Sequence, residues 1–298
     1  MILIIGHESD RSCQMTRAIL QERGVEVVLI NGSGLFSGEE MGFSLDRQNS
    51  DSFFTSDGRR IPYSDISTVL IRSLAQWEMA PDLSLQDRMY FVSEMWAAFN
   101  AIQRGLRCPV FNRLAPNVPY SPVVSEASAR LAMECEFQIP KFLTTATMEA
   151  ALDFYLRQEQ QVLLDDVLGS GPFQEIIGQP GLQVLRQNIS DHAISLLERP
   201  SGPMVQCLVV SDQVLAADAE GNKFELSLNS QESCRQLATS LKLPFVMILL
   251  ICGDDGQDYC LNINPHPLYF QWEEQLQEKV ATALADALEK SALEVIVQ

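Results

Sequence analysis

Short apolar runs separated by helical segments are the sequence feature that most restricts the fold of this chain. Residues 2–5 are apolar over the length of a strand, and residues 25–30 are apolar except for Glu26. Between them, Ser9 and Asp10 can cap a helix and Gly24 can end it. A strand that is apolar at every position is buried on both faces, which is typical of parallel sheets covered by helices. The beginning of the chain therefore predicts a parallel α/β domain.

Further elements of this first domain follow in order. Residues 67–71 predict another core strand, and residues 86–104 predict a long helix. Two segments, 43–46 and 52–55, precede an Asp-Gly pair and predict a small antiparallel excursion with a hairpin turn. The last strand of the domain is expected at residues 108–112.

Beyond that strand, the Pro- and Ser-containing stretch 114–125 predicts a linker. Helices are expected at 125–136 and at about 273–290, with strands and helices alternating between them. The acidic run 253–258 lacks the spacing of a calcium loop and is interpreted as a solvated hairpin turn.

The net charge of −18 limits the possible partners. So negative a surface repels phosphate backbones and anionic lipid, which argues against nucleic acid and membrane partners. A basic peptide or protein suits it better, and simple solubility is the alternative explanation. No apolar run reaches the roughly 18 residues of a spanning helix, and the apolar start predicts a buried strand, not a signal peptide.

The seven cysteines are scattered and contain no Cys-x-x-Cys pair. This pattern predicts reduced thiols in a cytoplasmic compartment, where most of them act as small core residues. With only three histidines, none close to a cysteine pair, the sequence argues against a zinc site.

Four segments, in order, resemble the ATP-grasp superfamily, and especially the branch that ligates peptides and amino acids (ribosomal-protein glutamate ligases and synthetases that cross-link ribosomal peptides). The first runs from Pro109-Val-Phe-Asn112 to Thr145, and the second is 161–171, which contains Gly169-Ser-Gly171. The third is 206–216, and the fourth is 243–265, which ends in Asn262-Ile-Asn264-Pro265. The N-terminal segment through residues 69–73 also fits the front domain of that branch.

The resemblance implies an α/β, ATP-grasp-like fold in which an N-terminal parallel α/β domain precedes central and C-terminal α+β domains. The implied boundaries are 1–115 for the N-terminal domain, 116–196 for a central lid domain and 197–298 for the C-terminal domain. It also implies a nucleotide cleft, in which Glu198 matches the hinge glutamate that holds the ribose. A homodimer is the oligomeric state that the family suggests.

The positions that should contact phosphate depart from the family pattern. Ser125 stands where the family has its first ATP-binding lysine, and Asp165 stands where it has the second. Gln206 replaces an arginine that touches the phosphates. Gly169 and Gly171 match the glycine-rich loop over the phosphates, and an ordinary turn is the alternative interpretation.

The positions that should hold metal depart as well. Leu249 falls where a metal-binding aspartate is expected, and Asn262 replaces the metal-binding glutamate. Only Asn264 of that motif is retained. Asn262, Asn264 and His266 form a polar cluster that either binds a ligand or satisfies backbone groups at a strand end.

The size of these losses decides the prediction. One lost charged contact costs about 2–3 kcal/mol, and several together would remove the roughly 8 kcal/mol of a micromolar affinity. The chain has only five lysines, and the nearest candidates for compensation are Lys141, Arg130 and Arg186. We therefore expect no ATP, no metal site and no other cofactor.

Three functional hypotheses remain open, and the catalytic residues are unknown in all of them. The leading one is a non-catalytic ATP-grasp relative that serves a biosynthetic system as a peptide- or protein-binding subunit. The second is an active ATP- and Mg-dependent carboxylate–amine ligase with a rearranged nucleotide site. The third is an ATP-independent enzyme that reuses the cleft through a cysteine or His266. At the end of the first strand, His7, Glu8 and Asp10 form either a ligand site or a helix cap.

Overall fold

A computed structural model of the chain describes residues 1–31, 41–42, 52–56, 58–72, 83–113, 126–166, 173–189 and 193–296. The chain folds into two compact units. The first comprises Met1–Ala115, Leu243–Phe245 and Leu268–Gln298, and the second comprises Pro116–Lys242 and Val246–Pro267. The predicted domain boundaries after residues 115 and 196 stay predictions. None of the described helices is long and apolar enough to cross a membrane.

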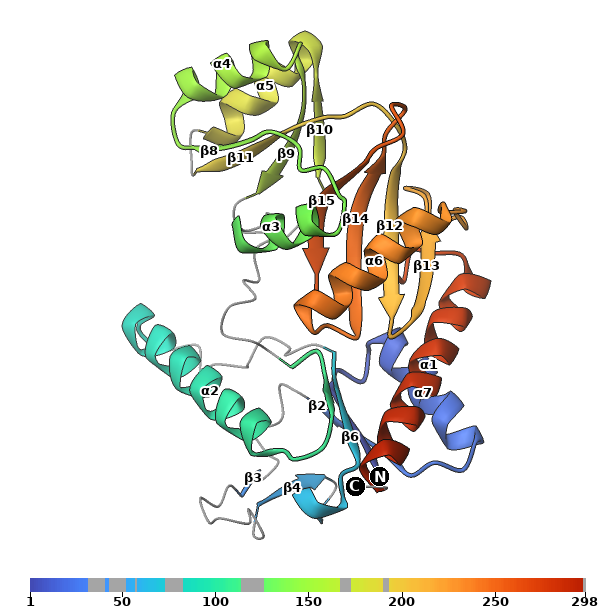
Figure 1. Ribbon diagram of the computed structural model, residues 1–298. Coiled ribbons are helices and arrows are strands. Elements are labelled where there is room, and N and C mark those ends of the chain that lie inside the picture. Colours follow the sequence, from blue (N-terminus) through green and yellow to red (C-terminus); the bar gives the residue numbers. More distant parts are fainter. Residues whose placement is uncertain are drawn as a thin grey trace. The chain divides into compact units, whose positions relative to one another are not determined.

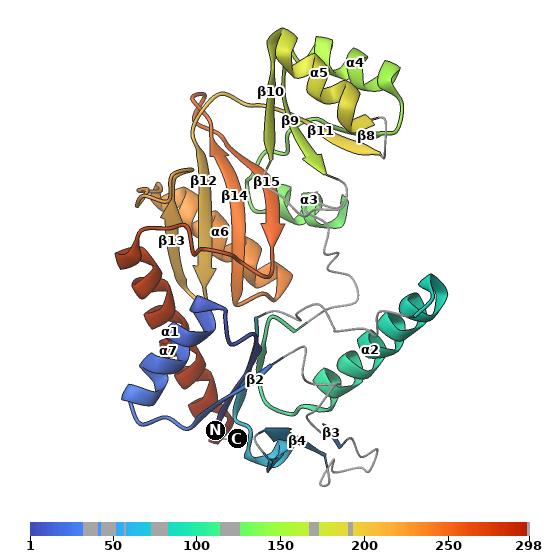
Figure 2. The ribbon, with the colours of Figure 1, turned by 180° about the vertical axis from the view of Figure 1, so that it is seen from behind.

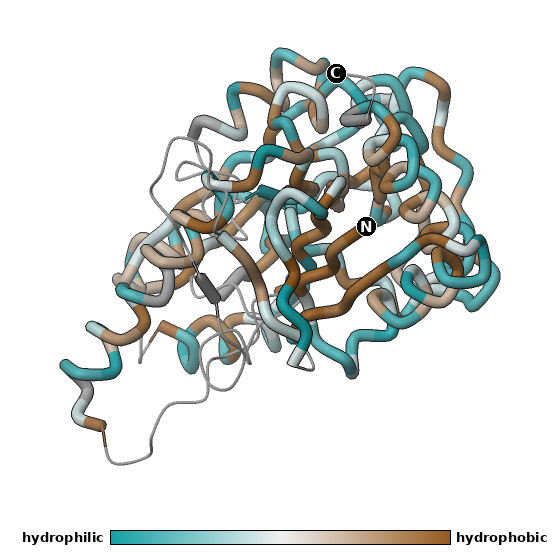
Figure 3. Tube along the Cα trace, turned by 90° about the horizontal axis from the view of Figure 1, so that it is seen from below, coloured by the Kyte–Doolittle hydropathy of each residue, from teal (hydrophilic) through white to brown (hydrophobic). Residues whose placement is uncertain are grey.

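The first unit is built on a parallel sheet with the strand order β2-β1-β6-β7 (Figure 1). Its strands are β1 (Ile2–Gly6), β2 (Val27–Asn31), β6 (Thr68–Ile71) and β7 (Val110–Phe111). Every residue of β1 is buried, and the chain beside the N label in Figure 3 is correspondingly brown. The predicted parallel α/β start is confirmed.

Two helices from opposite ends of the chain lie side by side in this unit (Figures 1 and 2). They are α1 (Arg11–Glu22) and α7 (Glu274–Ile296). Helix α7 also contacts β1 and β6. Ion pairs join the two helices, from Arg11 to Glu274 and from Arg23 to Asp286, each with an N–O distance of 2.7 Å.

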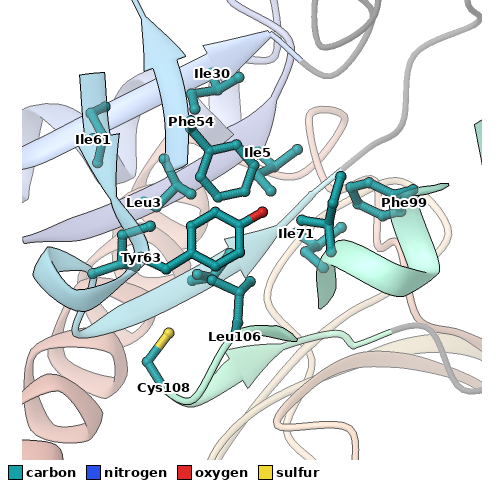
Figure 4. Close-up of a cluster of buried hydrophobic side chains, with 13 residues drawn as sticks. Leu3, Ile5, Ile30, Phe54, Ile61, Tyr63, Ile71, Phe99, Leu106 and Cys108 are labelled. Carbon is teal, nitrogen blue, oxygen red and sulfur yellow. The ribbon is translucent and has the colours of Figure 1, made fainter. Parts of the chain in front are cut away.

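A cluster of buried side chains fills the core of the first unit (Figure 4). Leu3 and Ile5 of β1 contribute to it, and so does Phe99 of helix α2 (Leu85–Gly105). The rings of Phe54 and Tyr63 stack with their centroids 4.9 Å apart. This arrangement ties the parallel sheet, α2 and the small antiparallel sheet into one core.

The small antiparallel sheet has the order β3-β4-β5. It consists of β3 (Met41–Gly42), β4 (Phe53–Ser56) and β5 (Arg59–Pro62), and the 3-10 turn Tyr63–Asp65 follows it. Strands β4 and β5 form the predicted hairpin. The strand predicted at 43–46 lies outside the described residues.

The second unit contains two four-stranded sheets. One has the order β10-β9-β11-β8 with antiparallel neighbours, and helices α4 and α5 pack together against it (Figure 1). Its elements are β8 (Phe142–Thr145), α4 (Met148–Arg157), β9 (Gln161–Asp166), β10 (Gln174–Ile177), α5 (Gly178–Ile189) and β11 (Ile194–Glu198). We refer to it as the lid sheet.

The other sheet has the order β13-β12-β14-β15, and helix α6 packs on β12 and β13. Its elements are β12 (Met204–Val210), β13 (Gln213–Ala217), α6 (Leu228–Leu241), β14 (Phe245–Cys252) and β15 (Asp258–Asn264), and α3 (Glu126–Glu134) contacts α6. We refer to it as the floor sheet. The two sheets confirm the predicted α+β character of the second half of the chain.

Candidate functional site

The second unit contains all the residues of the predicted nucleotide site, but not all of them are described. Ser125, Gly169 and Gly171 lie outside the described residues. The backbone of Asp165 belongs to β9, where Asp165 pairs with Ser195 of β11. Glu198 ends β11, while Gln206, Leu249, Asn262 and Asn264 belong to strands of the floor sheet. His266 lies two residues after the end of β15.

An apolar layer joins the lid sheet to the floor sheet. Leu163 and Leu197 enter it from β9 and β11, while Ile251 and Leu261 enter it from β14 and β15. Leu249 packs against this layer. The other partly buried members are Phe173, Met204 and Tyr259. Leu249 is therefore a packing residue between the sheets, at a position where the resemblance implies a metal-binding carboxylate.

A β-bulge sets the direction of the neighbouring side chain. Leu249 pairs with Asn262, but the next residue, Leu250, pairs with Cys260, so Leu261 is an extra residue in β15. Residues directly opposite in a sheet point to the same face, and alternate residues of a strand do too. Asn262 and Asn264 consequently lie on the same face of the floor sheet as Leu249.

The two asparagines differ in how they are bonded. Oδ1 of Asn264 accepts a hydrogen bond from the His266 backbone N–H at 2.8 Å, so it satisfies a backbone group at the strand end. Oδ1 of Asn262 is buried, and no donor among the described residues reaches it. Asn264 therefore fits the interpretation in which the cluster bonds backbone groups at a strand end. For Asn262 both interpretations, ligand binding and backbone bonding, stay open.

Gln206 belongs to the same face. It is half-buried on β12, between the buried residues Val205 and Cys207. Met204, two residues earlier, packs in the apolar layer. Because alternate residues of a strand share a face, Gln206 points to the side of Leu249 and Asn262.

Glu198, the last residue of β11, is hydrogen-bonded to Lys141, which directly precedes β8 of the lid sheet. The Glu198 carboxylate accepts hydrogen bonds from the backbone N–H of Lys141 at 3.2 Å and from its Nζ at 3.3 Å. The Glu198 N–H donates in turn to the Lys141 carbonyl oxygen at 2.8 Å. Lys141, a candidate for charge compensation, is therefore engaged by Glu198.

Sequence reasoning missed the loop after β11. Nε of Arg199 lies 2.9 Å from Oε1 of Glu175, and Nη1 donates to the carbonyl oxygens of Pro200 and, at 3.2 Å, of Gly202. Gly202 has a φ of +130°, and a Cβ there would lie 2.1 Å from the carbonyl oxygen of Cys252. The Pro-Ser-Gly-Pro sequence around Gly202 was the available signal, since it marks a tight loop.

The acidic run at the β14–β15 connection forms the predicted hairpin turn. Asp255 accepts hydrogen bonds from the Tyr259 hydroxyl at 2.8 Å and from the Gln257 N–H at 3.0 Å. The Tyr259 bond, followed by that from Gln257, lowers the pKa of the Asp255 carboxyl. Within the described ranges, no group of three or more His, Cys, Asp or Glu side chains is placed to hold a metal ion.

In the first unit, Asp10 caps a helix and forms an ion pair. Its Oδ1 accepts from the Ser12 N–H at 2.8 Å, and its Oδ2 lies 3.2 Å from Nη2 of Arg72. Arg72 is buried, and its guanidinium lies 5.3 Å from the Phe245 ring centroid and 5.9 Å from that of Tyr269. The capping alternative is therefore confirmed for Asp10, while Arg72 was missed as its partner.

All seven cysteines are free, and six are buried, which agrees with the prediction that they act as small core residues. Burial, reinforced by the Asp10 carboxylate, raises the pKa of the Cys13 thiol to about 12. Burial likewise raises the pKa of Cys252 to about 12 and that of Cys108 to about 11. These thiols are protonated near neutral pH and are poor nucleophiles.

The sequence matches no protein-family model and no curated protein. Solved structures match over almost the whole chain. The ATP-grasp ligase PsnB, complexed with a phosphomimetic variant of its minimal precursor, Mg and ADP, has 21% sequence identity and a TM-score of 0.77 over 97% of this chain and 98% of that one. The macrocyclase MdnC from Microcystis aeruginosa MRC, bound to the precursor peptide MdnA, has 14% identity and a TM-score of 0.77 over 97% and 99%.

A third match is a RiPP-associated ATP-grasp ligase from Chryseobacterium gregarium, in complex with ADP and a leader and core peptide. It has 17% identity and a TM-score of 0.74 over 97% of this chain and 96% of that one. The chain therefore has the fold of the ATP-grasp peptide ligases, as the resemblance implied.

Proposed function

We propose that this protein is a non-catalytic ATP-grasp relative that binds a peptide or a protein in a peptide-modifying biosynthetic system. The observation that carries the proposal is the cross-strand pair of Leu249 and Asn262, at the positions aligned with the metal-binding carboxylates of the family. The fold supports the resemblance on which this alignment rests.

The residues on this face do not fit a magnesium ion. A hard divalent cation requires several oxygen ligands, most of them carboxylates. Leu249 offers none and packs in the apolar layer, and Asn262 offers one neutral oxygen. We therefore derive no catalytic step through Mg-ATP.

The charges nearby do not favour a triphosphate either. The neutral Gln206 takes the place aligned with an arginine, and Asp165 takes a place aligned with a lysine. Lys141 and Arg199 are engaged by Glu198 and Glu175. Phosphate recognition depends on cationic side chains or backbone N–H groups, so this face of the floor sheet is poorly suited to ATP.

A peptide partner is supported by the structural relatives. PsnB, MdnC and the Chryseobacterium gregarium ligase are each complexed with a precursor or a leader and core peptide. The net charge of −18 favours a peptide with basic residues. We therefore expect the protein to bind a peptide without ATP-dependent catalysis.

Calorimetric titration with Mg-ATP tests the proposal. We expect no binding heat and no thermal shift at millimolar Mg-ATP, with or without metal. A matched variant that combines Leu249→Asp, Asn262→Glu, Asp165→Lys and Gln206→Arg serves as the control, because it restores the charges that the resemblance implies. Magnesium-dependent binding or ATP-dependent turnover by the unaltered protein would overturn the proposal in favour of an active ligase.

Two predictions remain alongside this proposal. An ATP-independent enzyme that uses Cys13, Cys108 or Cys252 as its nucleophile is disfavoured, because burial raises the pKa of each of these thiols. The homodimer is tested by light scattering of the purified chain. Cytoplasmic localisation is tested by fractionating the cells that produce the protein.

A further inference from the structure

The carbonyl oxygen of the Asn262 side chain is the starting point of a further inference. This Oδ1 is buried, and no described donor reaches it. Buried acceptors are almost always hydrogen-bonded in native proteins, because their desolvation is otherwise uncompensated. An acceptor of this kind, on the face that the resemblance assigns to the nucleotide site, indicates a ligand that supplies the donor.

The bulge at Leu261 keeps two amide side chains on this face. Asn262 and Asn264 are two residues apart on β15 and point to the same side. Oδ1 of Asn264 is engaged by the His266 N–H, and no hydrogen bond joins its Nδ2 group to an acceptor in the described part of the chain, so Nδ2 can donate to another molecule. The face therefore offers an acceptor and a donor at the spacing of alternate strand residues.

The surroundings exclude several ligand classes for this acceptor. An ionised phosphate carries acceptors and cannot donate to Oδ1. An ammonium group could donate, but it would have to be desolvated beside Leu249 and the apolar layer, where one neutral oxygen compensates poorly. A neutral N–H donor has a smaller desolvation cost than an ammonium group in this environment.

A peptide group meets the requirement in either orientation of the side-chain amide. Rotating the Asn262 amide by 180° exchanges Oδ1 and Nδ2, so the site then needs an acceptor instead of a donor. An extended peptide presents both an N–H and a carbonyl oxygen along its edge. The neutral amide is thus the chemical group that complements both asparagines.

We propose that the Asn262–Asn264 face of β15 is a subsite that binds the backbone amides of an extended, uncharged stretch of the peptide partner. This subsite rests on the proposed function, since it names the ligand chemistry of the same face of the floor sheet. It assigns the recognition of the peptide backbone to the two asparagines.

The test uses the full chain and a defined library of N-acetylated, C-amidated 12-residue peptides. Peptides retained by the protein are identified by mass spectrometry, and the most enriched one is labelled and titrated by fluorescence anisotropy. We expect Asn262→Leu to weaken its binding at least about tenfold, the loss typical of a buried hydrogen bond. The control Asn229→Ala, at an exposed position of α6, should change the affinity less than about twofold.

Methylating the peptide N–H groups one at a time locates the contact. At one position, methylation should weaken binding to the unaltered protein at least about tenfold. The same methylation should weaken binding to Asn262→Leu little further, because that variant has already lost the hydrogen bond. A structural role for Asn262 would instead lower the melting temperature of Asn262→Leu. We expect that temperature to stay the same or rise, because the variant removes an unpaired acceptor.

Three results would overturn the inference: no retained peptide, equal affinity for Asn262→Leu, or no methylation-sensitive position. Equal affinity would overturn only the subsite and leave peptide binding intact. Failure of the proposed function is detected separately, as magnesium-dependent ATP binding in the calorimetric titration.

Discussion

Leu249 and Asn262 lie directly opposite each other on β14 and β15, on the side of the floor sheet that packs against Leu163 and Leu197. An aliphatic side chain and a neutral amide thus meet where the resemblance implies two carboxylates. The pair connects packing to function, because the same leucine that fills the apolar layer leaves a cation without a ligand.

Replacing Leu249 by Asp should destabilise the protein by at least about 2 kcal/mol, because a carboxylate enters the apolar layer. Millimolar magnesium should not restore the loss, since Asn262 adds only a neutral oxygen. Urea denaturation followed by circular dichroism measures the free energy of unfolding. The control Leu228→Asp, at a leucine that is 81% exposed, should change it by less than about 0.5 kcal/mol. A magnesium-dependent recovery of the single variant would contradict this expectation.

Replacing Arg72 by Met should lower the free energy of unfolding by about 3–5 kcal/mol. The Arg72 side chain is 1% exposed and pairs with Asp10, so the substitution leaves a carboxylate beside an apolar core. Arg157→Met is the matched control, because the Arg157 side chain is 72% exposed in its pair with Asp153. This substitution should lower the free energy of unfolding by less than about 1 kcal/mol. Similar losses for both variants would refute the structural role assigned to Arg72.

Alanine substitutions at Gly202 and Gly256 distinguish the cost of a steric clash from the cost of backbone strain. Both have positive φ, but a Cβ at Gly202 would lie 2.1 Å from the Cys252 carbonyl oxygen, whereas a Cβ at Gly256 meets nothing within 4 Å. Gly256→Ala should therefore cost about 1 kcal/mol, from the left-handed conformation alone. Gly202→Ala should cost more than about 2 kcal/mol, since the loop must also move. Chemical denaturation measures the loss in free energy of unfolding for each variant. Equal losses would contradict the prediction, because they would mean that the loop accommodates the Cβ at residue 202 without an energetic cost.

The buried thiols predict a loss of stability in alkali. The pKa of Cys13 is about 12 in the folded protein and about 9 when exposed. The unfolded chain therefore releases this proton first, so stability is complete below pH 9 and falls as the pH rises from 9 towards 12. The fall per thiol is at most about 1.4 kcal/mol per pH unit.

Denaturation curves between pH 8 and pH 10 measure this slope. Cys13→Ala removes one of the titrating thiols and should flatten the slope, even if its stability at pH 8 is lower. An unchanged slope in the variant would show that Cys13 does not titrate on unfolding in this range.

Local signals were sufficient for much of the fold. The apolar runs at β1, β2 and β6 predicted the parallel sheet, and β1 and β6 are buried at every position, as strands covered on both faces are. Asp10 was identified as a helix cap from its place before a helical segment, and it does accept the Ser12 N–H. The hairpin at residues 253–258 followed from its glycines and acidic residues.

Only the tertiary structure decided the contacts between distant segments. Arg72 finds Asp10 across 62 residues, and α7 pairs with α1 from the other end of the chain. The bulge that turns Asn262 towards Leu249, and leaves its Oδ1 buried, depends on the register of β14 and β15. Caps, turns and buried strands are encoded within a few residues of sequence, whereas ion pairs, register and orphaned acceptors depend on which remote surfaces pack together.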